Sequence, residues 1–189
     1  MDNYNFLLAI LWFCEDIHHS SILKLAIEKA IQKFTNANLS SKLAIAKGTL
    51  LAVADGSYIR KQHPDLCAAA FILECMRHRG MLVGSFPEAS KVANAFQGEL
   101  LGLMAIHLLL LAVNTVSPGL TVRVKIYLDC LGALGRTLPP YCIPTRCKHS
   151  NVLKMILVNC GGLSFHREYI HVNAHQDNPK RCWTPAPNP

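Results

Sequence analysis

The chain has 189 residues, enough for one domain of ordinary size and a short additional segment. Hydrophobic residues make up 51% of it and charged residues only 16%, so it can bury a large core, which excludes a mostly disordered chain. With 19 Lys and Arg against 12 Asp and Glu, the formal net charge is +7, which favours polyanionic partners such as nucleic acid or anionic lipid.

Residues 1–41 are predicted to form a helical N-terminal segment. The start, MDNYN, carries an Asp and neither Lys nor Arg, unlike a secretory signal peptide, so we expect an intracellular protein of the cytoplasm or nucleus. From residue 21 to 34 apolar residues recur every three to four positions, which is typical of an amphipathic helix. The polar run NANLSSK follows, and we place the domain boundary near Lys42.

Three sequential antiparallel strands are predicted next. Apolar runs of strand length occupy residues 49–54, 68–76 and 81–86. Asp55-Gly56-Ser57 predicts a turn after the first run, and residues 77–80 predict a hairpin turn before the third.

A buried helix follows these strands. Asn94 can cap it, and Gln97, three residues later, can complete a capping box. The apolar stretch ends at Val113 and contains His107, so it is too short and too polar for a membrane span, which needs about 20 apolar residues. A membrane-associated protein is therefore the least favoured interpretation, and we expect no membrane partner.

The C-terminal part adds two strands and a helix. Residues 122–128 alternate between apolar and polar and predict a strand that ends at Asp129. Residues 150–160 predict a short helix, residues 169–174 a last strand, and residues 179–189 an irregular proline-rich tail. The predicted order is βββ-α-β-α-β, an α/β fold.

The eight cysteines contain no CxxC pair and are expected to be reduced thiols. Cys142, Cys147 and His149 are spaced C-x4-C-x-H, which could suggest zinc. A structural zinc site needs a fourth ligand and usually a closer pair of cysteines, so packing or loop cysteines are favoured.

Three acidic residues stand where soluble domains seldom place unpaired carboxylates. Asp55 follows an apolar strand, Glu99 lies on the sheet-facing side of the buried helix, and Asp129 ends the fourth strand. If the first and fourth strands are neighbours, the three carboxylates converge. They would then repel one another unless a divalent cation neutralised them, and oxygen ligands suit Mg²⁺ or Mn²⁺.

Each acid alone also has an ordinary interpretation. Asp55 fits a turn, Glu99 fits a helix start favoured by the macrodipole, and Asp129 fits the end of a strand. Their combination, in this order on these elements, indicates something more specific.

Five segments resemble a type-1 ribonuclease H domain, of the kind found at the end of retroelement reverse transcriptase-related reading frames. They are ADGSY, GELLGLMAIHLLL, IYLDCLGAL, CKHSNVLK and YIHVNAHQDN, and the resemblance covers residues 42–178. It implies a ribonuclease H-like fold: a mixed five-stranded sheet, three antiparallel strands and then parallel additions, flanked by helices. The order Asp, Glu, Asp argues against transposase and integrase relatives, in which the glutamate comes last.

The resemblance also implies roles for single residues. Asp55, Glu99 and Asp129 match the family's ligands for two Mg²⁺ ions, for which Mn²⁺ can substitute. The ions activate a water and stabilise the leaving oxygen during attack on the RNA strand of an RNA–DNA hybrid. His175 matches the mobile histidine after the last strand, a proton carrier or product-release residue, although it could be an ordinary histidine.

The sequence departs from the family near its C-terminus. The fourth carboxylate belongs on a helix after the histidine loop, but here the chain reads NPKRCWTPAPNP. Either Asp177 substitutes as a metal ligand or that position is missing. Together with the N-terminal segment, which matches nothing in the family, this suggests a truncated copy of a mobile-element protein, whose intact relatives belong to a larger reverse transcriptase polyprotein.

Nucleic-acid contacts have weaker support. Arg60, Lys61 and Lys148 are the favoured phosphate contacts, because the first two adjoin the predicted catalytic strand. Polar residues that could meet the minor groove and its 2′-hydroxyls are Ser57, Asn94 and Gln97, although turn and cap roles explain them equally well.

The function expected from these residues is metal-dependent endonucleolytic cleavage of the RNA strand of hybrids. The alternative is a catalytically inactive nucleic-acid-binding remnant of such a domain.

Overall fold

A computed structural model describes residues 49–75, 80–116, 122–137, 143 and 148–173. The predicted N-terminal helix, the boundary near Lys42, the hairpin turn at 77–80 except its last residue, and the proline-rich tail lie outside these residues. The expected division of the chain into segments therefore stays a prediction.

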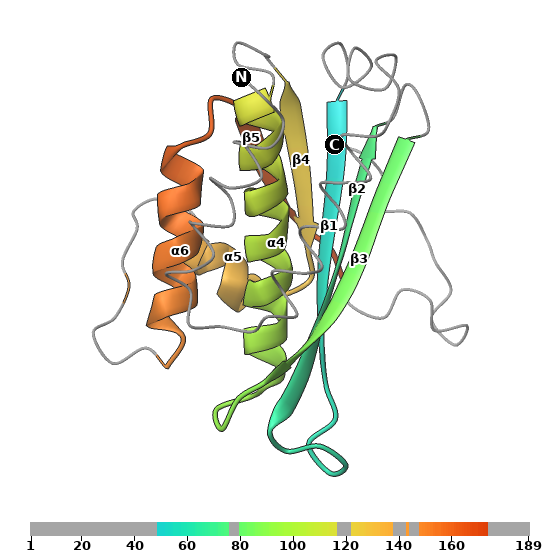
Figure 1. The fold of residues 1–189 in the computed structure, drawn as a ribbon, viewed down its shortest axis with the longest axis vertical. Helices are drawn as coiled ribbons and strands as arrows, with labels where there is room; N and C mark the ends of the chain where they lie inside the picture. Colours follow the sequence, from blue (N-terminus) through green and yellow to red (C-terminus); the bar gives the residue numbers. More distant parts are fainter. Residues whose placement is uncertain (1–48, 76–79, 117–121, 138–142, 144–147, 174–189) are drawn as a thin grey trace.

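The described residues form a five-stranded sheet with the strand order β3-β2-β1-β4-β5 (Figure 1). β1 is antiparallel to β2, and β2 to β3, whereas β4 runs parallel to both β1 and β5. This mixed sheet confirms the predicted fold class. The strands are β1 (Thr49–Tyr58), β2 (Leu66–Cys75), β3 (Gly80–Ala89), β4 (Arg123–Leu128) and β5 (His166–His171).

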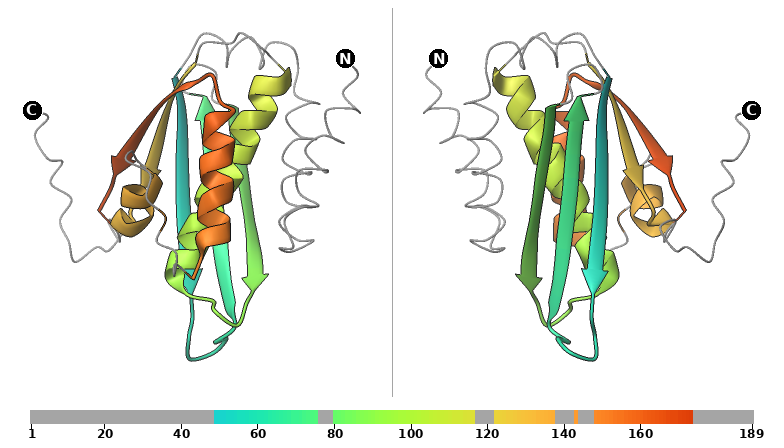
Figure 2. Two further views of the ribbon diagram at one scale, coloured as in Figure 1. Left: turned by 90° about the vertical axis from the view of Figure 1, so that its left-hand side faces the viewer. Right: turned by 90° about the vertical axis from the view of Figure 1, so that its right-hand side faces the viewer.

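Three described helices lie together on one side of the sheet (Figures 1 and 2). They are α4 (Ala95–Val116), α5 (Leu131–Thr137) and α6 (Ser150–Gly161). The side chains of α4 are apolar nearly all round because this helix is covered by the sheet on one side and by α6 on the other. It is the one described helix long and apolar enough to span a membrane, yet 89% of its apolar window is buried inside the protein.

The core lies between the sheet and α4. Alternate residues of β1 and β4, such as Ala52 and Ile126, point to the helices and are fully buried. Their partners on α4 include Leu103 and Ile106, which are equally buried. This alternation is the period-two pattern that predicted the strand at 122–128.

The structure corrects two expected elements and adds a third that was not expected. Asp55-Gly56-Ser57 is not a turn, because β1 continues through these residues in antiparallel pairing with β2. The last strand begins at His166 rather than at residue 169, since it pairs with β4 from Arg123 onward. The short helix α5 was not predicted, because its seven residues include two glycines and too little apolar periodicity to be recognised.

Asn159 of α6 is 1% exposed, and both polar atoms of its side chain are without a hydrogen-bond partner. Burial of an unbonded amide costs about 1–3 kcal/mol. We therefore expect Asn159→Leu to raise the free energy of unfolding by about 1–2 kcal/mol, measured by urea denaturation. The exposed Asn151→Leu, on the same helix, is the control for helix propensity, and equal effects of the two substitutions would contradict this interpretation.

Candidate metal centre

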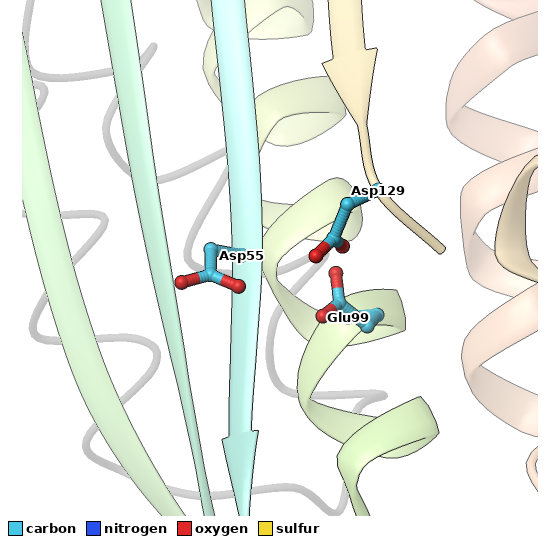
Figure 3. Close-up of side chains that lie close together, drawn as sticks. All are labelled: Asp55, Glu99 and Asp129. Atoms are coloured by element: carbon cyan, nitrogen blue, oxygen red, sulfur yellow. The ribbon is translucent and has the colours of Figure 1, made fainter. Parts of the chain in front are cut away.

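Three carboxylates from three elements converge at one end of the β1–β4 pair (Figure 3). Asp55 lies within β1, Glu99 in the second turn of α4, and Asp129 directly after β4. The parallel pairing of β1 with β4 brings the two aspartates to the same level, as the sequence predicts. Each residue offers one oxygen, and these oxygens all lie within 4.8 Å of one another.

Glycines allow α4 to approach the sheet closely enough for Glu99 to reach the aspartates. A Cβ added to Gly98 would lie 2.7 Å from the carbonyl oxygen of Ala68, and one added to Gly56 would overlap the backbone of Gly98 and Glu99. The helix therefore touches β1 and β2 backbone to backbone. Because of this contact, Oε1 of Glu99 accepts a hydrogen bond of 2.9 Å from the Gly56 amide.

Glu99 is only 6% exposed, and two other carboxylates lie close to it. Burial, and then the negative charge of Asp129, raise its pKa to about 7; the hydrogen bond from the Gly56 amide acts in the opposite direction, and the charge of Asp55 adds to the rise. Its second oxygen, Oε2, is buried without a hydrogen-bond partner.

These residues fit a divalent cation. A cation between the carboxylates would give Oε2 of Glu99 the partner that it lacks and would offset the repulsion among the acids. A set of carboxylate oxygens alone suits hard cations such as Mg²⁺ or Mn²⁺. Within the described part of the chain, these acids are the one such group of possible metal ligands.

The other predicted site residues are dispersed. Ser57, Arg60, Lys61 and Lys148 are exposed, the first three at or after the end of β1. His175 and Asp177 lie outside the described residues, as do Cys142 and Cys147, so their roles stay predictions.

Asn94 and Gln97 have the predicted cap geometry, and their groove contacts stay predictions. Oδ1 of Asn94 accepts a 2.8 Å hydrogen bond from the Gln97 amide, which caps α4. The capping box is incomplete, because Oε1 of the buried Gln97 is without a partner. The backbone amide of Asn94, which Gln97 would bond in a complete capping box, instead hydrogen-bonds to the thiol of Cys67 on β2.

His171, at the end of β5, is a residue that sequence reasoning missed. Its Nε2 donates a 3.1 Å hydrogen bond to the carbonyl oxygen of Asp129. The parallel pairing continues one residue further, since the Val172 amide donates to Leu128. Its place in the predicted last strand was the one sequence feature that could have drawn attention to it. The register that sets His171 beside Leu128 cannot be deduced from the sequence.

Comparison with solved structures places the fold among ribonucleases H. The RNase H1 of the halophilic archaeon Halobacterium salinarum NRC-1 is 15% identical with a TM-score of 0.50, covering 67% of this chain and 87% of that one. The prototype foamy virus protease–reverse transcriptase is 15% identical with a TM-score of 0.51, covering 73% of this chain and 19% of that one.

At such identities the likeness establishes the fold, and the described residues have a ribonuclease H-like fold. The type-1 ribonuclease H resemblance is thus confirmed at the level of the fold. Neither a scan of protein-family models nor a sequence search of the curated proteins gave a match.

The contact between α4 and the sheet is testable with two glycines. Gly98→Ala places a methyl group against backbone, so we expect the free energy of unfolding to fall by about 1–3 kcal/mol. Gly135→Ala on α5 meets nothing within 4 Å and is the matched control. It should stabilise the protein by about 0.5–1 kcal/mol, as alanine does in a helix. Equal denaturation midpoints for the two variants would refute the close contact.

The raised pKa of Glu99 predicts the sign of a pH dependence. Between the ordinary value of 4.5 and the folded value of about 7, the metal-free folded state binds more protons than the unfolded state. Stability contributed by Glu99 is therefore present below pH 4.5 and is lost as the pH rises through 7. In EDTA, the unfolding free energy of the parent should fall relative to that of Glu99→Gln between about pH 5 and 8.

The matched control for this experiment is Glu168→Gln, an exposed position on β5, which should follow the parent. A constant difference between the parent and Glu99→Gln across the range would contradict the raised pKa.

Proposed function

We propose that this chain is a divalent-metal-dependent endonuclease of the ribonuclease H type, which hydrolyses the RNA strand of RNA–DNA hybrids. The observation that carries the proposal is the buried, unpartnered Oε2 of Glu99 between Asp55 and Asp129, at this position of a ribonuclease H-like fold. A structural carboxylate would be expected to have a protein donor at both oxygens.

The residues of the chain have distinct roles in this proposal. Asp55, Glu99 and Asp129 would hold two Mg²⁺ ions, for which Mn²⁺ could substitute. The Gly56 amide orients Glu99 by its hydrogen bond. When bound, the ions supply Lewis-acid stabilisation of charge on the phosphate oxygens and lower the pKa of the attacking water. His175 carries a proton or assists product release, and Asp177 adds a further ligand.

The charge of the chain supports a nucleic-acid substrate. The net charge is +7, and the exposed side chains of Arg60, Lys61 and Lys148 would contact phosphates. The likeness to a retroviral protease–reverse transcriptase supports an origin in a mobile element. The localisation that we propose, cytoplasm or nucleus, rests on the sequence alone.

The test is cleavage of a labelled RNA–DNA hybrid by the purified chain in Mg²⁺, Mn²⁺ or EDTA. We expect cleavage of the RNA strand with either metal and none in EDTA. Asp129→Asn should retain the fold, because it removes like-charge repulsion, but reduce cleavage to below about 1% of the parent rate, a loss of about 2.7 kcal/mol of transition-state stabilisation.

The matched control is Asp65→Asn, in the exposed loop before β2, which should cleave like the parent. Cleavage by Asp129→Asn at the parent rate would refute the metal assignment. A folded parent that binds hybrid without cleaving it in either metal would establish the inactive remnant instead.

A further inference from the structure

Two segments meet at the start of α4, about one turn before Glu99. Asn94 precedes the helix, its backbone carbonyl accepts the first helical hydrogen bond from Gly98, and its side chain caps Gln97. From the opposite side comes His149, the residue at the N-terminus of α6. Its carbonyl accepts a hydrogen bond from Leu153, which holds it at the start of that helix.

His149 is 6% exposed, and its side chain packs against this first turn. Its ring lies 5.8 Å from that of Phe96, centroid to centroid, at an angle of 56°. Nε2 lies 3.1 Å from Nδ2 of Asn94. Burial, and then the charge of Lys148, lower the pKa of His149, which favours a neutral ring.

Donor and acceptor roles in this cluster are forced by chemistry. The Gln97 amide can only donate, so the atom of Asn94 that it contacts at 2.8 Å must be the carbonyl oxygen. The Asn94 amide nitrogen, which carries two hydrogens, donates one to the carbonyl of Val92 at 3.3 Å. The same nitrogen lies 3.1 Å from Nε2 of His149, and because an amide nitrogen can only donate, Nε2 must accept and carry no proton.

This arrangement controls where Glu99 stands. The side-chain amide of Asn94 contacts Val92 and His149 through Nδ2 and the Gln97 backbone amide through Oδ1. The backbone carbonyl of Asn94 accepts from the Gly98 amide. Gly98 is the residue that lies against the backbone of β2, and Glu99 follows it directly. A shift in this turn would separate Oε1 of Glu99 from the Gly56 amide.

We propose that His149 is a positioning residue of the acidic site: its neutral, Nδ1-protonated ring fixes the Asn94 amide, and through it the turn of α4 that carries Glu99. The proposal rests on the proposed nuclease function for its effect on cleavage, but its structural steps are measurable without substrate or metal.

The first experiment measures hydrogen exchange of the Gly56 amide in the full-length, metal-free chain, relative to the Val53 amide of the same strand. His149→Leu removes the acceptor, and His149→Gln keeps one on a side chain of similar reach. His166→Leu, at an exposed position of β5, is the matched control. We expect more than tenfold faster exchange at Gly56 in His149→Leu alone, with Val53 unchanged.

Unchanged exchange at Gly56 in His149→Leu would overturn the proposal, as would an equal acceleration at Val53, because general destabilisation affects both amides. Failure of His149→Gln to restore the parent rate would also overturn it, since the role assigned to His149 is that of an acceptor.

The second experiment tests the hydrogen-bond roles by ¹⁵N NMR of the histidine rings. The parent should show a neutral His149 with the proton on Nδ1, and a proton on Nε2 would overturn the proposal. Asn94→Asp keeps the helix cap but presents a carboxylate oxygen to Nε2. It should raise the pKa of His149 by more than one unit, and an unchanged pKa would show that residue 94 does not face the ring.

The third measurement is cleavage kinetics. His149→Leu should lower kcat by about tenfold or more with little change in KM, since the substrate-facing surface is intact, and His149→Gln should restore it. If the parent does not cleave hybrid, the proposed function fails while the exchange and NMR results still decide the role of His149. If the parent cleaves and His149→Leu has the parent kcat, the positioning role fails alone.

Discussion

The acidic site depends on one steric constraint, the backbone contact between α4 and the antiparallel strands β1 and β2. A Cβ at Gly98 would meet the carbonyl of Ala68 at 2.7 Å, and a Cβ at Gly56 would overlap the helix. Because neither residue has one, α4 lies close enough for a glutamate on its second turn to hydrogen-bond to the β1 backbone. With any larger side chain at these positions, Glu99 would stand away from Asp55 and Asp129.

The energy for this contact comes from the apolar remainder of α4. Residues from Leu100 to Leu110 are buried against the sheet and α6, and each fully buried Leu or Ile contributes about 1.5–3 kcal/mol. The acidic site at the N-terminal end opposes folding, because burial and like charge raise the pKa of Glu99 to about 7. The apolar length of α4, which resembles a membrane span by composition, therefore compensates for a site that destabilises the metal-free fold.

Sequence patterns predicted those parts of this arrangement that depend on periodic hydrophobicity or on the order of the acidic residues along the chain. The alternation before Asp129 predicted β4, the apolar length of α4 predicted a buried helix, and the Asp, Glu, Asp order predicted the converging acids. The strand through Asp55 was missed because pairing with β2 overrides the local turn preference of Asp-Gly-Ser. The contacts of His149 and His171 were missed because they depend on strand register and helix placement, which no local pattern encodes.

Two histidines link α4 to neighbouring elements, His149 at its N-terminus and His107 near its middle, and Glu99 lies between these two contacts. His107 is fully buried, donates from Nδ1 to the carbonyl of Leu103 at 2.8 Å and accepts at Nε2 from the Tyr169 hydroxyl of β5. Burial lowers its pKa to about 4, so between about pH 6.5 and 4 the unfolded chain binds the proton more readily, and stability falls as the pH falls through this range. The pKa of Glu99 is displaced in the opposite direction, to about 7, so its carboxylate is mostly charged only above that pH. Unprotonated histidines at both contacts and a charged glutamate therefore coexist above about pH 7. In this range the acidic site can bind a cation, which would offset the stability that the charged Glu99 costs the metal-free fold.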